Sequence, residues 1–144
     1  MKLSNIPVAW NDTAVDYPQD WVIHQLFEAQ VERTPEATAY IFENDTLTYR
    51  DLNKRANRLA HYLRRAGVGP EVWVGLCVNR SPAMVVSILA ILKAGGAYVP
   101  LEPTAPRLRL QQILQDTGPP LLLLQSHLDQ FDGYDGQKVY LDHL

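Results

Sequence analysis

Two short stretches of the sequence are almost entirely apolar, and they restrict the possible folds more than any other feature. Residues 72–78 read VWVGLCV and residues 121–124 read LLLL. A run that is apolar at every position, instead of every second one, is typical of a strand covered on both faces of its sheet. Such sheets are built from parallel strands joined by helices. The two runs therefore predict an α/β fold.

The segments around these runs supply the other expected elements. Residues 97–101 (AYVPL) and 138–142 (KVYLD) predict two more short strands of the sheet, and residues 38–44 (TAYIFEN) predict a strand followed by a turn at Asn44 and Asp45. Helical spacing or helix-start signals predict helices in residues 21–34, 82–94 and 107–117. Since strands and helices alternate, right-handed crossovers should produce a doubly wound, mostly parallel sheet with flanking helices. Residues 1–20 lack periodicity and are expected to form a linker or arm, with the domain occupying 21–144.

The segment LTYRDL, residues 47–52, contains a helix-start signal. Thr48 can accept the N–H of Asp51, while the Asp51 carboxylate reaches back to the N–H of Thr48, which together make a capping box. Leu47 and Leu52 then occupy the positions of a hydrophobic staple. Gly67 supplies the residue that tolerates a left-handed conformation after the helix.

Composition and charge exclude several function classes. The chain has 144 residues, 47% of them hydrophobic, and a formal charge of −3, which gives no electrostatic reason to expect nucleic acid. Cys77 is the only cysteine, so an internal disulfide is impossible, and its apolar surroundings favour a buried, inert thiol. The sequence begins without a signal-peptide pattern, and its longest apolar stretch is too short for a membrane span. We therefore expect a cytoplasmic protein that binds neither nucleic acid nor membrane.

Motifs that carry catalysis are missing from the sequence. It contains no G-x-x-x-x-G-K-[ST] phosphate loop, no G-x-G-x-x-G and no G-x-S-x-G elbow. The four histidines have no metal-ligand spacing, and the aspartates of residues 129–136 (DQFDGYDG) do not match a calcium loop. We expect no catalytic, cofactor-binding or metal-binding residue in this chain.

The segment ILKAGGAYVPLEP, residues 91–103, brings a lysine beside two glycines and suggests a phosphate site. A phosphate-binding glycine loop runs from a strand into the N-terminus of a helix, where free N–H groups face the anion. Here Gly95 follows a helix, so carbonyl groups lie nearby. Gly95 is therefore expected to end the helix, and Lys93 to complement the negative end of the helix dipole.

Two ordered motifs give the chain a family resemblance. Residues 47–52 resemble the first core motif of nonribosomal peptide synthetase adenylation domains, L-[TS]-Y-x-E-L, with Asp51 in place of glutamate. Residues 92–103 resemble the second, L-K-A-G-x-A-Y-x-P-L-D-P, with Glu102 in place of aspartate. Residues 10–18 (WNDTAVDYP) are similar to the linker between a condensation and an adenylation domain. The motif residues are Leu47, Thr48, Tyr49, Asp51, Leu52, Leu92, Lys93, Ala94, Gly95, Ala97, Tyr98, Pro100, Leu101 and Glu102. The family commonly has a tyrosine where Ala105 stands here.

The resemblance implies the N-terminal portion of an adenylate-forming enzyme, with an incomplete N-terminal subdomain. The parent domain would use ATP and Mg²⁺ to convert an amino acid to aminoacyl-AMP, and would then load it onto the phosphopantetheine thiol of a carrier domain. Its phosphate loop, amino-acid pocket and catalytic lysine belong to later parts of the domain, and Lys93 is not that lysine. The motif residues are thus expected to be structural, and the isolated chain to be inactive.

Two other functions are alternatives to this one. The chain could be a docking module that binds the remainder of the domain, or a neighbouring condensation domain through residues 10–18. It could also be a free flavodoxin-like nucleotide binder, but that hypothesis rests on fold class alone.

Overall fold

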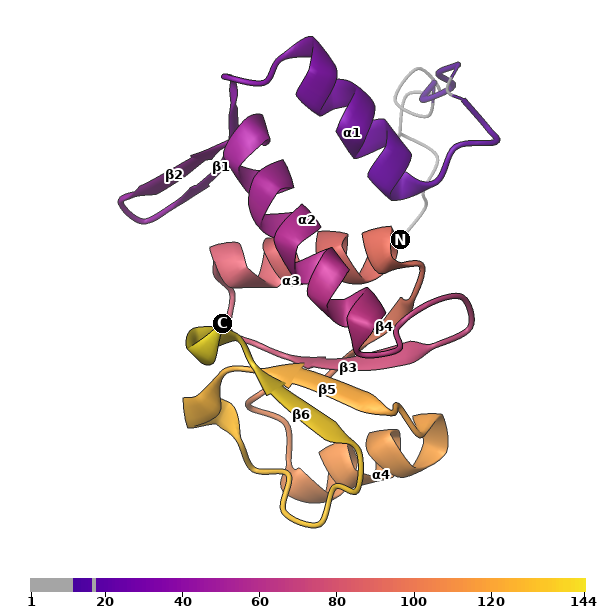
Figure 1. The fold of residues 1–144 in the computed structure, drawn as a ribbon, viewed down its shortest axis with the longest axis vertical. Coiled ribbons are helices and arrows are strands. Elements are labelled where there is room, and N and C mark those ends of the chain that lie inside the picture. The colour runs from indigo at the N-terminus through magenta and orange to yellow at the C-terminus, as the bar shows by residue number, and fades with distance from the viewer. Residues whose placement is uncertain (1–11, 17) are drawn as a thin grey trace, which may run out of the picture.

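The computed structural model describes residues 12–16 and 18–144 (Figure 1). Its helices are α1 (Ile23–Arg33), α2 (Tyr49–Arg65), α3 (Pro82–Ala94) and α4 (Arg107–Thr117), with short 3₁₀ helices η2 (Ser126–Leu128) and η3 (Leu141–His143). Its strands are β1 (Thr38–Phe42), β2 (Asp45–Thr48), β3 (Trp73–Cys77), β4 (Ala97–Pro100), β5 (Leu121–Leu124) and β6 (Gln137–Tyr140). The predicted linker in residues 1–20 falls mostly outside the described residues. Its boundary at residue 20 stays a prediction.

Four parallel strands form the main sheet in the order β4-β3-β5-β6. Helices α2 and α3 lie over one face and α4 over the other (Figure 1). After β3, the chain forms β4 on one side of that strand. It then crosses over to form β5 on the other side of β3. This confirms the predicted α/β fold with a doubly wound, parallel sheet and flanking helices.

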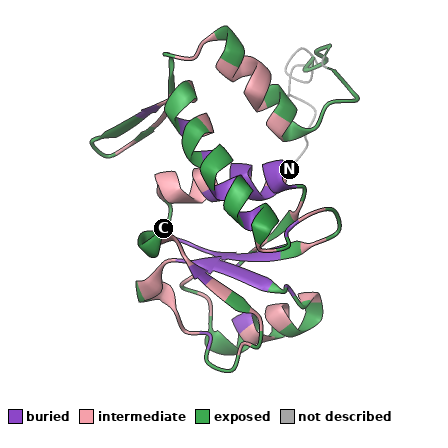
Figure 2. Ribbon diagram, in the orientation of Figure 1, coloured by how far each residue is buried: buried purple, intermediate pink, exposed green. Residues whose placement is uncertain are grey.

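The two apolar runs form the centre of the sheet, as Figure 2 shows by their burial. Successive residues of a strand point to opposite faces. Accordingly Leu121 and Leu123 join the core under α2 and α3, whereas Leu122 and Leu124 join the core against α4. Full burial of all four leucines is the reason that the run shows no alternation.

The hairpin of β1 and β2 is separate from the main sheet and differs from the sequence prediction. The two strands are antiparallel and Phe42 pairs with Asp45. The turn therefore lies at Glu43 and Asn44, and Asp45 begins a second strand that the sequence analysis did not predict. Glu43 adopts φ 52°, a left-handed conformation that glycine or asparagine usually occupies.

Helix α2 is capped at both ends, by a side chain at its start and by backbone hydrogen bonds at its end. The hydroxyl of Thr48 accepts the N–H of Asp51 at 3.1 Å, as predicted. The predicted contact from the Asp51 carboxylate to the Thr48 N–H is replaced by another one. Asp51 Oδ2 accepts the Thr48 hydroxyl at 3.0 Å, and Thr48 belongs to the paired strands β1 and β2. At the other end Gly67 has φ 92°, and the N–H of Val68 bonds to the carbonyl of Leu63 at 2.9 Å. The N–H of Gly67 also bonds to the carbonyl of Arg64 at 3.1 Å, and the two bonds form a Schellman motif.

Helices α3 and α4 also follow the predicted signals. Pro82 occupies the first turn of α3, but the Ser81 hydroxyl bonds to the Asn79 carbonyl at 3.1 Å instead of capping the helix. Gly95 and Gly118 end α3 and α4 in left-handed conformations. None of the helices in the described part of the chain is both long and apolar enough to cross a bilayer.

Helix α1 is the least buried of the helices α1 to α4. All eleven of its residues are described, and none is fully buried. Ile23 is 70% exposed, although its spacing with Leu26 is that of a core-facing helix. The sequence therefore predicted the helix correctly, but the structure leaves part of its apolar face uncovered.

Candidate functional site

Ligands of open parallel sheets usually bind at the carboxyl ends of the strands, where the chain direction switches. In this sheet the chain direction switches between β3 and β5. Residues of the loops that follow these two strands contact one another there. The N–H of Asn79 donates to Gln125 Oε1 at 2.9 Å, and Asn79 Nδ2 lies 3.2 Å from His127 Nε2. The polar groups at this edge thus bond to one another.

Asp142 closes the same edge from η3. Its carboxylate accepts the N–H of Ser126 at 2.9 Å and also the Ser126 hydroxyl. These two hydrogen bonds, the hydroxyl first, lower the pKa of Asp142 from 3.8 to about 2. The contact fastens the loop after β5 to the end of β6, and it leaves Asp142 ionised at neutral pH.

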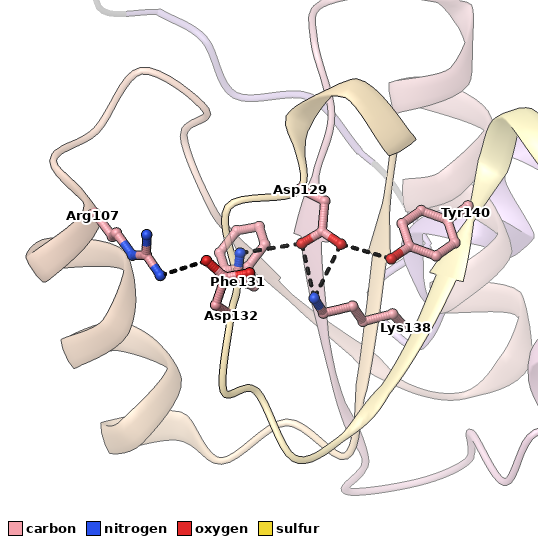
Figure 3. A network of polar contacts seen from close by, with 6 residues as sticks. All are labelled: Arg107, Asp129, Phe131, Asp132, Lys138 and Tyr140. Atoms are coloured by element: carbon pink, nitrogen blue, oxygen red, sulfur yellow. Dashed lines mark hydrogen bonds and ion pairs between the residues drawn. The ribbon is translucent and has the colours of Figure 1, made fainter.

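A second polar network lies around Asp129, in the loop that connects β5 to β6 (Figure 3). Its carboxylate binds Lys138 Nζ at 2.9 Å, the Tyr140 hydroxyl at 2.6 Å and the N–H of Phe131 at 3.1 Å. Burial would raise the pKa of Asp129, but the hydrogen bonds from Tyr140 and Lys138 outweigh it, so the pKa is lowered. Asp129, which does not match a calcium loop in the sequence, therefore belongs to an ordered junction between this loop and β6.

An ion pair between Arg107 Nη2 and Asp132 Oδ2, at 2.8 Å, ties this loop to α4. Both side chains are largely exposed, so the pair stabilises the fold only slightly. Figure 3 shows it beside the Asp129 network. Together these contacts order a connection that contains no long helix.

A groove of about 780 Å³ lies between the end of α4 and the same loop. It opens at the amino ends of β5 and β6, which is the opposite edge from the one that binds ligands in this class of sheet. The Tyr134 hydroxyl at its side already donates to the Pro119 carbonyl at 2.7 Å, and burial raises the pKa of Tyr134 to about 12. Its described polar groups do not converge on one catalytic arrangement.

The first motif serves helix start and packing. Leu47 and Leu52 are buried in one cluster, which confirms the predicted staple. The ring of Tyr49 lies 5.9 Å from that of Phe27 in α1. Together with the Thr48 and Asp51 contacts, every named position of this motif has a structural partner within the fold.

The second motif joins α3 to β4 and does not form a phosphate cradle. A Cβ on Gly96 would lie 2.7 Å from Val68 Cγ1 and 3.0 Å from the carbonyl oxygen of Val72, so this glycine permits close packing. The N–H of Leu101 bonds to the Leu76 carbonyl at 2.9 Å, which extends the pairing of β4 with β3. Of the remaining motif positions, Ala94 is buried, Leu92 is half-buried, and Ala97, Tyr98, Pro100 and Glu102 are exposed.

Lys93 lies in the last turn of α3, as predicted, but its ammonium group also has a partner in another helix. Its side chain is only 4% exposed, and its Nζ pairs with Glu28 of α1. Nζ also lies 5.9 Å from the centre of the Phe27 ring. It is Arg64 of α2 that donates to the carbonyl of Lys93 at the end of the helix. Sequence reasoning missed Glu28 as a partner, since the two residues are far apart in the chain.

Two further predictions concern single residues. Cys77 is buried, and burial raises its pKa to about 11, which agrees with an inert thiol. Ala105, where the family usually has tyrosine, packs at the edge of the α4 core. Its N–H bonds to the Glu102 carbonyl at 2.9 Å, so the segment keeps an ordered turn.

In the described part of the chain, the second motif does not fit an ATP site. The glycines of the second motif follow a helix, and Gly96 is closed by Val68 and Val72. Within the described ranges, no group of three histidine, cysteine, aspartate or glutamate side chains could hold a metal ion.

Comparisons with known proteins agree with the two motifs. A family model described as AMP-binding enzyme matches residues 27–142. Tyrocidine synthase 3 of Brevibacillus parabrevis is 54% identical over 123 residues, which cover 85% of this chain and 2% of that protein. Gramicidin S synthase 2 of Brevibacillus brevis is 50% identical over 123 residues, which cover 85% of this chain and 3% of that protein. The chain thus spans only a few per cent of these relatives' length.

Solved structures also resemble this chain over most of its length. The nonribosomal peptide synthetase FmoA3 is 35% identical with a TM-score of 0.79, and the match covers 92% of this chain and 15% of that chain. The N-terminal subdomain of Klebsiella oxytoca NpsA is 24% identical with a TM-score of 0.75, and the match covers 82% of this chain and 30% of that chain. At that identity the NpsA match shows the fold alone.

Proposed function

The chain belongs to the family of AMP-binding enzymes, as the N-terminal portion of a nonribosomal peptide synthetase adenylation domain, and we propose that it serves as the structural frame of an amino-acid-activating domain. The complete domain would use ATP and Mg²⁺ to form an aminoacyl-AMP. It would then transfer the aminoacyl group to the phosphopantetheine thiol of a carrier domain. The chain's own share in this activity is the parallel sheet and its capped helices.

The observation that carries this proposal is the placement of the two family motifs. Thr48 and Asp51 start a helix, and Gly95 and Gly96 end one and pack it against the sheet. These are tasks of folding, and no reacting group is needed for them. A form of FmoA3 bound to AMPPNP is 30% identical to this chain, with a TM-score of 0.77, which supports the use of ATP by the complete domain.

The same matches favour this function over a free-standing docking module. The partners that we propose are the remainder of the adenylation domain and, in the same synthetase, condensation and carrier domains. The cytoplasmic location remains a prediction from the sequence.

The proposal can be tested with ATP–pyrophosphate exchange over a pool of amino acids. The isolated chain should show no exchange above the background of a denatured sample. A relative's adenylation domain whose matched segment is replaced by residues 27–142 of this chain should retain exchange. Exchange by the isolated chain would contradict the assignment, and so would a folded but inactive hybrid.

A further inference from the structure

A cleft between α1 and α2 is lined almost entirely by polar and charged side chains, and we infer that it binds a small oxyanion of the phosphate class. The cleft has a volume of about 300 Å³ and is lined by His24, Gln25, Glu28, Asn57, Ala60, His61, Arg64 and Lys93. None of the adenylation functions proposed above requires it. Its volume lies at the lower end of the range for ligand pockets, so it suits a ligand the size of one phosphate group with a short substituent.

One wall of the cleft is a single face of α2. Asn57, His61 and Arg64 follow one another at intervals of four and three residues, which places their side chains on the same side of the helix. Ala60 lies between them and carries only a methyl group, so it leaves space at the base of the wall. The spacing thus presents an amide, an imidazole and a guanidinium to the same volume.

The floor of the cleft is the buried ammonium group of Lys93. Its partner, the Glu28 carboxylate, comes from the opposite wall and is 46% exposed. The pair shows that a carboxylate, which is itself an oxyanion, fits against Lys93 in this cleft. Because Glu28 is half-exposed, an incoming anion can compete with it for the positive charge.

The charges of the lining favour an anion. Arg64 and Lys93 are positive and Glu28 is negative, which leaves one net positive charge from these three side chains. One guanidinium nitrogen of Arg64 donates to the Lys93 carbonyl, and this contact orients the planar group beside the floor. The Oε1 atom of Gln25 accepts the Val22 N–H at 3.0 Å, so the remaining groups of this amide are donors.

The donor types point to phosphate in particular. Guanidinium groups bind phosphate oxygens through paired N–H donors, and a nearby ammonium adds charge. Histidine and amide N–H groups around them supply further hydrogen bonds to the same oxygens. A singly charged carboxylate would use fewer of these donors and should bind more weakly.

The proposal can be tested on the 144-residue chain by NMR titration. The probes are inorganic phosphate and glycerol 3-phosphate, with sodium acetate as the monoanion control and sodium chloride holding the ionic strength constant. Saturable shifts of the His24 and His61 ring signals are expected with at least one phosphate probe. Binding of glycerol 3-phosphate alone would identify the phosphate group of a larger molecule as the ligand, whereas binding of both would include the free ion.

Three variants separate a binding site from a general charge effect. Arg64→Gln should weaken binding about tenfold, since it removes a charge-assisted contact. Arg65→Gln removes the same charge from the neighbouring position of α2, which does not line the cleft, and should leave the affinity unchanged. Glu28→Gln removes the competing carboxylate and should tighten binding several-fold. Its fold is checked by circular dichroism, and Arg64→Gln and Arg65→Gln decide the test if Glu28→Gln unfolds.

Shifts that rise linearly without saturation would overturn the proposal. Equal weakening by Arg64→Gln and Arg65→Gln, or acetate binding as tightly as phosphate, would also overturn it. Each of these results would leave the proposed adenylation function intact, because that function is tested by exchange activity.

Discussion

The hydroxyl of Tyr140, at the end of β6, donates a hydrogen bond of 2.6 Å to Oδ2 of Asp129, eleven residues earlier in the chain. This bond joins the edge strand of the sheet to the loop that leads into it (Figure 3). It raises the pKa of Tyr140, because the neutral hydroxyl is the form that donates, and it helps to lower the pKa of Asp129.

Replacing Tyr140 with phenylalanine removes this donor and leaves the ring in place. We expect the pKa of Asp129 to rise towards 3.8, and the urea midpoint of unfolding to fall. Carbon-13 NMR of the Asp129 carboxyl group measures the first effect. Tyr98→Phe on the opposite edge strand is the control, and a similar change in that variant would show that the bond has no specific role.

Acid should destabilise the protein through Asp142. The pKa of Asp142 is about 2 in the folded chain, whereas its ordinary value is 3.8. Its contribution to stability is therefore present above the ordinary pKa and is lost progressively as pH falls towards 2. Asp142→Asn should flatten the dependence of the unfolding midpoint on pH in this window. Chemical denaturation at several pH values measures the slope, and an unchanged slope would contradict the assignment to Asp142.

The Lys93 and Glu28 pair should respond unequally to loss of either partner. Glu28→Gln leaves a buried ammonium group without its counter-charge and should cost about 3 kcal/mol. Lys93→Met keeps the apolar stem and leaves a half-exposed carboxylate that water can solvate, so it should cost about 1 kcal/mol. Urea denaturation of both variants gives the comparison. If both variants lost the same free energy of unfolding, burial of Lys93 would not be the main determinant of the pair's energetics.

Two helix-start residues of the chain, Thr48 and Ser81, offer a matched pair of cap substitutions. Thr48→Ala removes a side-chain cap and should destabilise the protein by about 1 kcal/mol. Ser81→Ala should cost much less, because the Ser81 hydroxyl does not cap its helix. A larger loss at Ser81 in thermal unfolding would contradict this ranking.

Gly96→Ala should destabilise the protein by about 1–3 kcal/mol, because the added methyl group meets Val68 and the backbone of Val72. Gly69→Ala adds the same group where nothing lies within 4 Å, and serves as the control. Thermal unfolding of the two variants should separate them clearly. Equal stability would show that the close approach at Gly96 relaxes without cost.

Local signals in the sequence were enough to predict most of the fold. The caps at Thr48, Gly67 and Gly95 depend on residues within six positions of one another, and the fully apolar run 121–124 directly reflects its two covered faces. The second strand of the hairpin was missed because it has only four residues and its turn uses Glu43 instead of glycine.

Contacts between distant segments could not be predicted in the same way. Nothing near Lys93 in the sequence indicates that Glu28 will reach it, since that contact depends on how α1 crosses α3. The Asp129 network has the same origin, because β6 must pair with β5 before Tyr140 comes near the loop. The family could be predicted without these contacts, because the two motifs that indicate it are continuous in the sequence.

Helix α1, with its uncovered apolar side and its one buried ionic tether, also has a mechanical consequence. Tension applied through the residues before it would load the Glu28 contact with Lys93 and the Phe27 ring contacts, while the hydrogen-bonded strands stayed in register. Because none of its side chains is fully buried, α1 should separate from α2 and α3 before the strands of the sheet come apart. The main sheet would carry the load only after this step, so detachment of α1 would delay unfolding of the sheet.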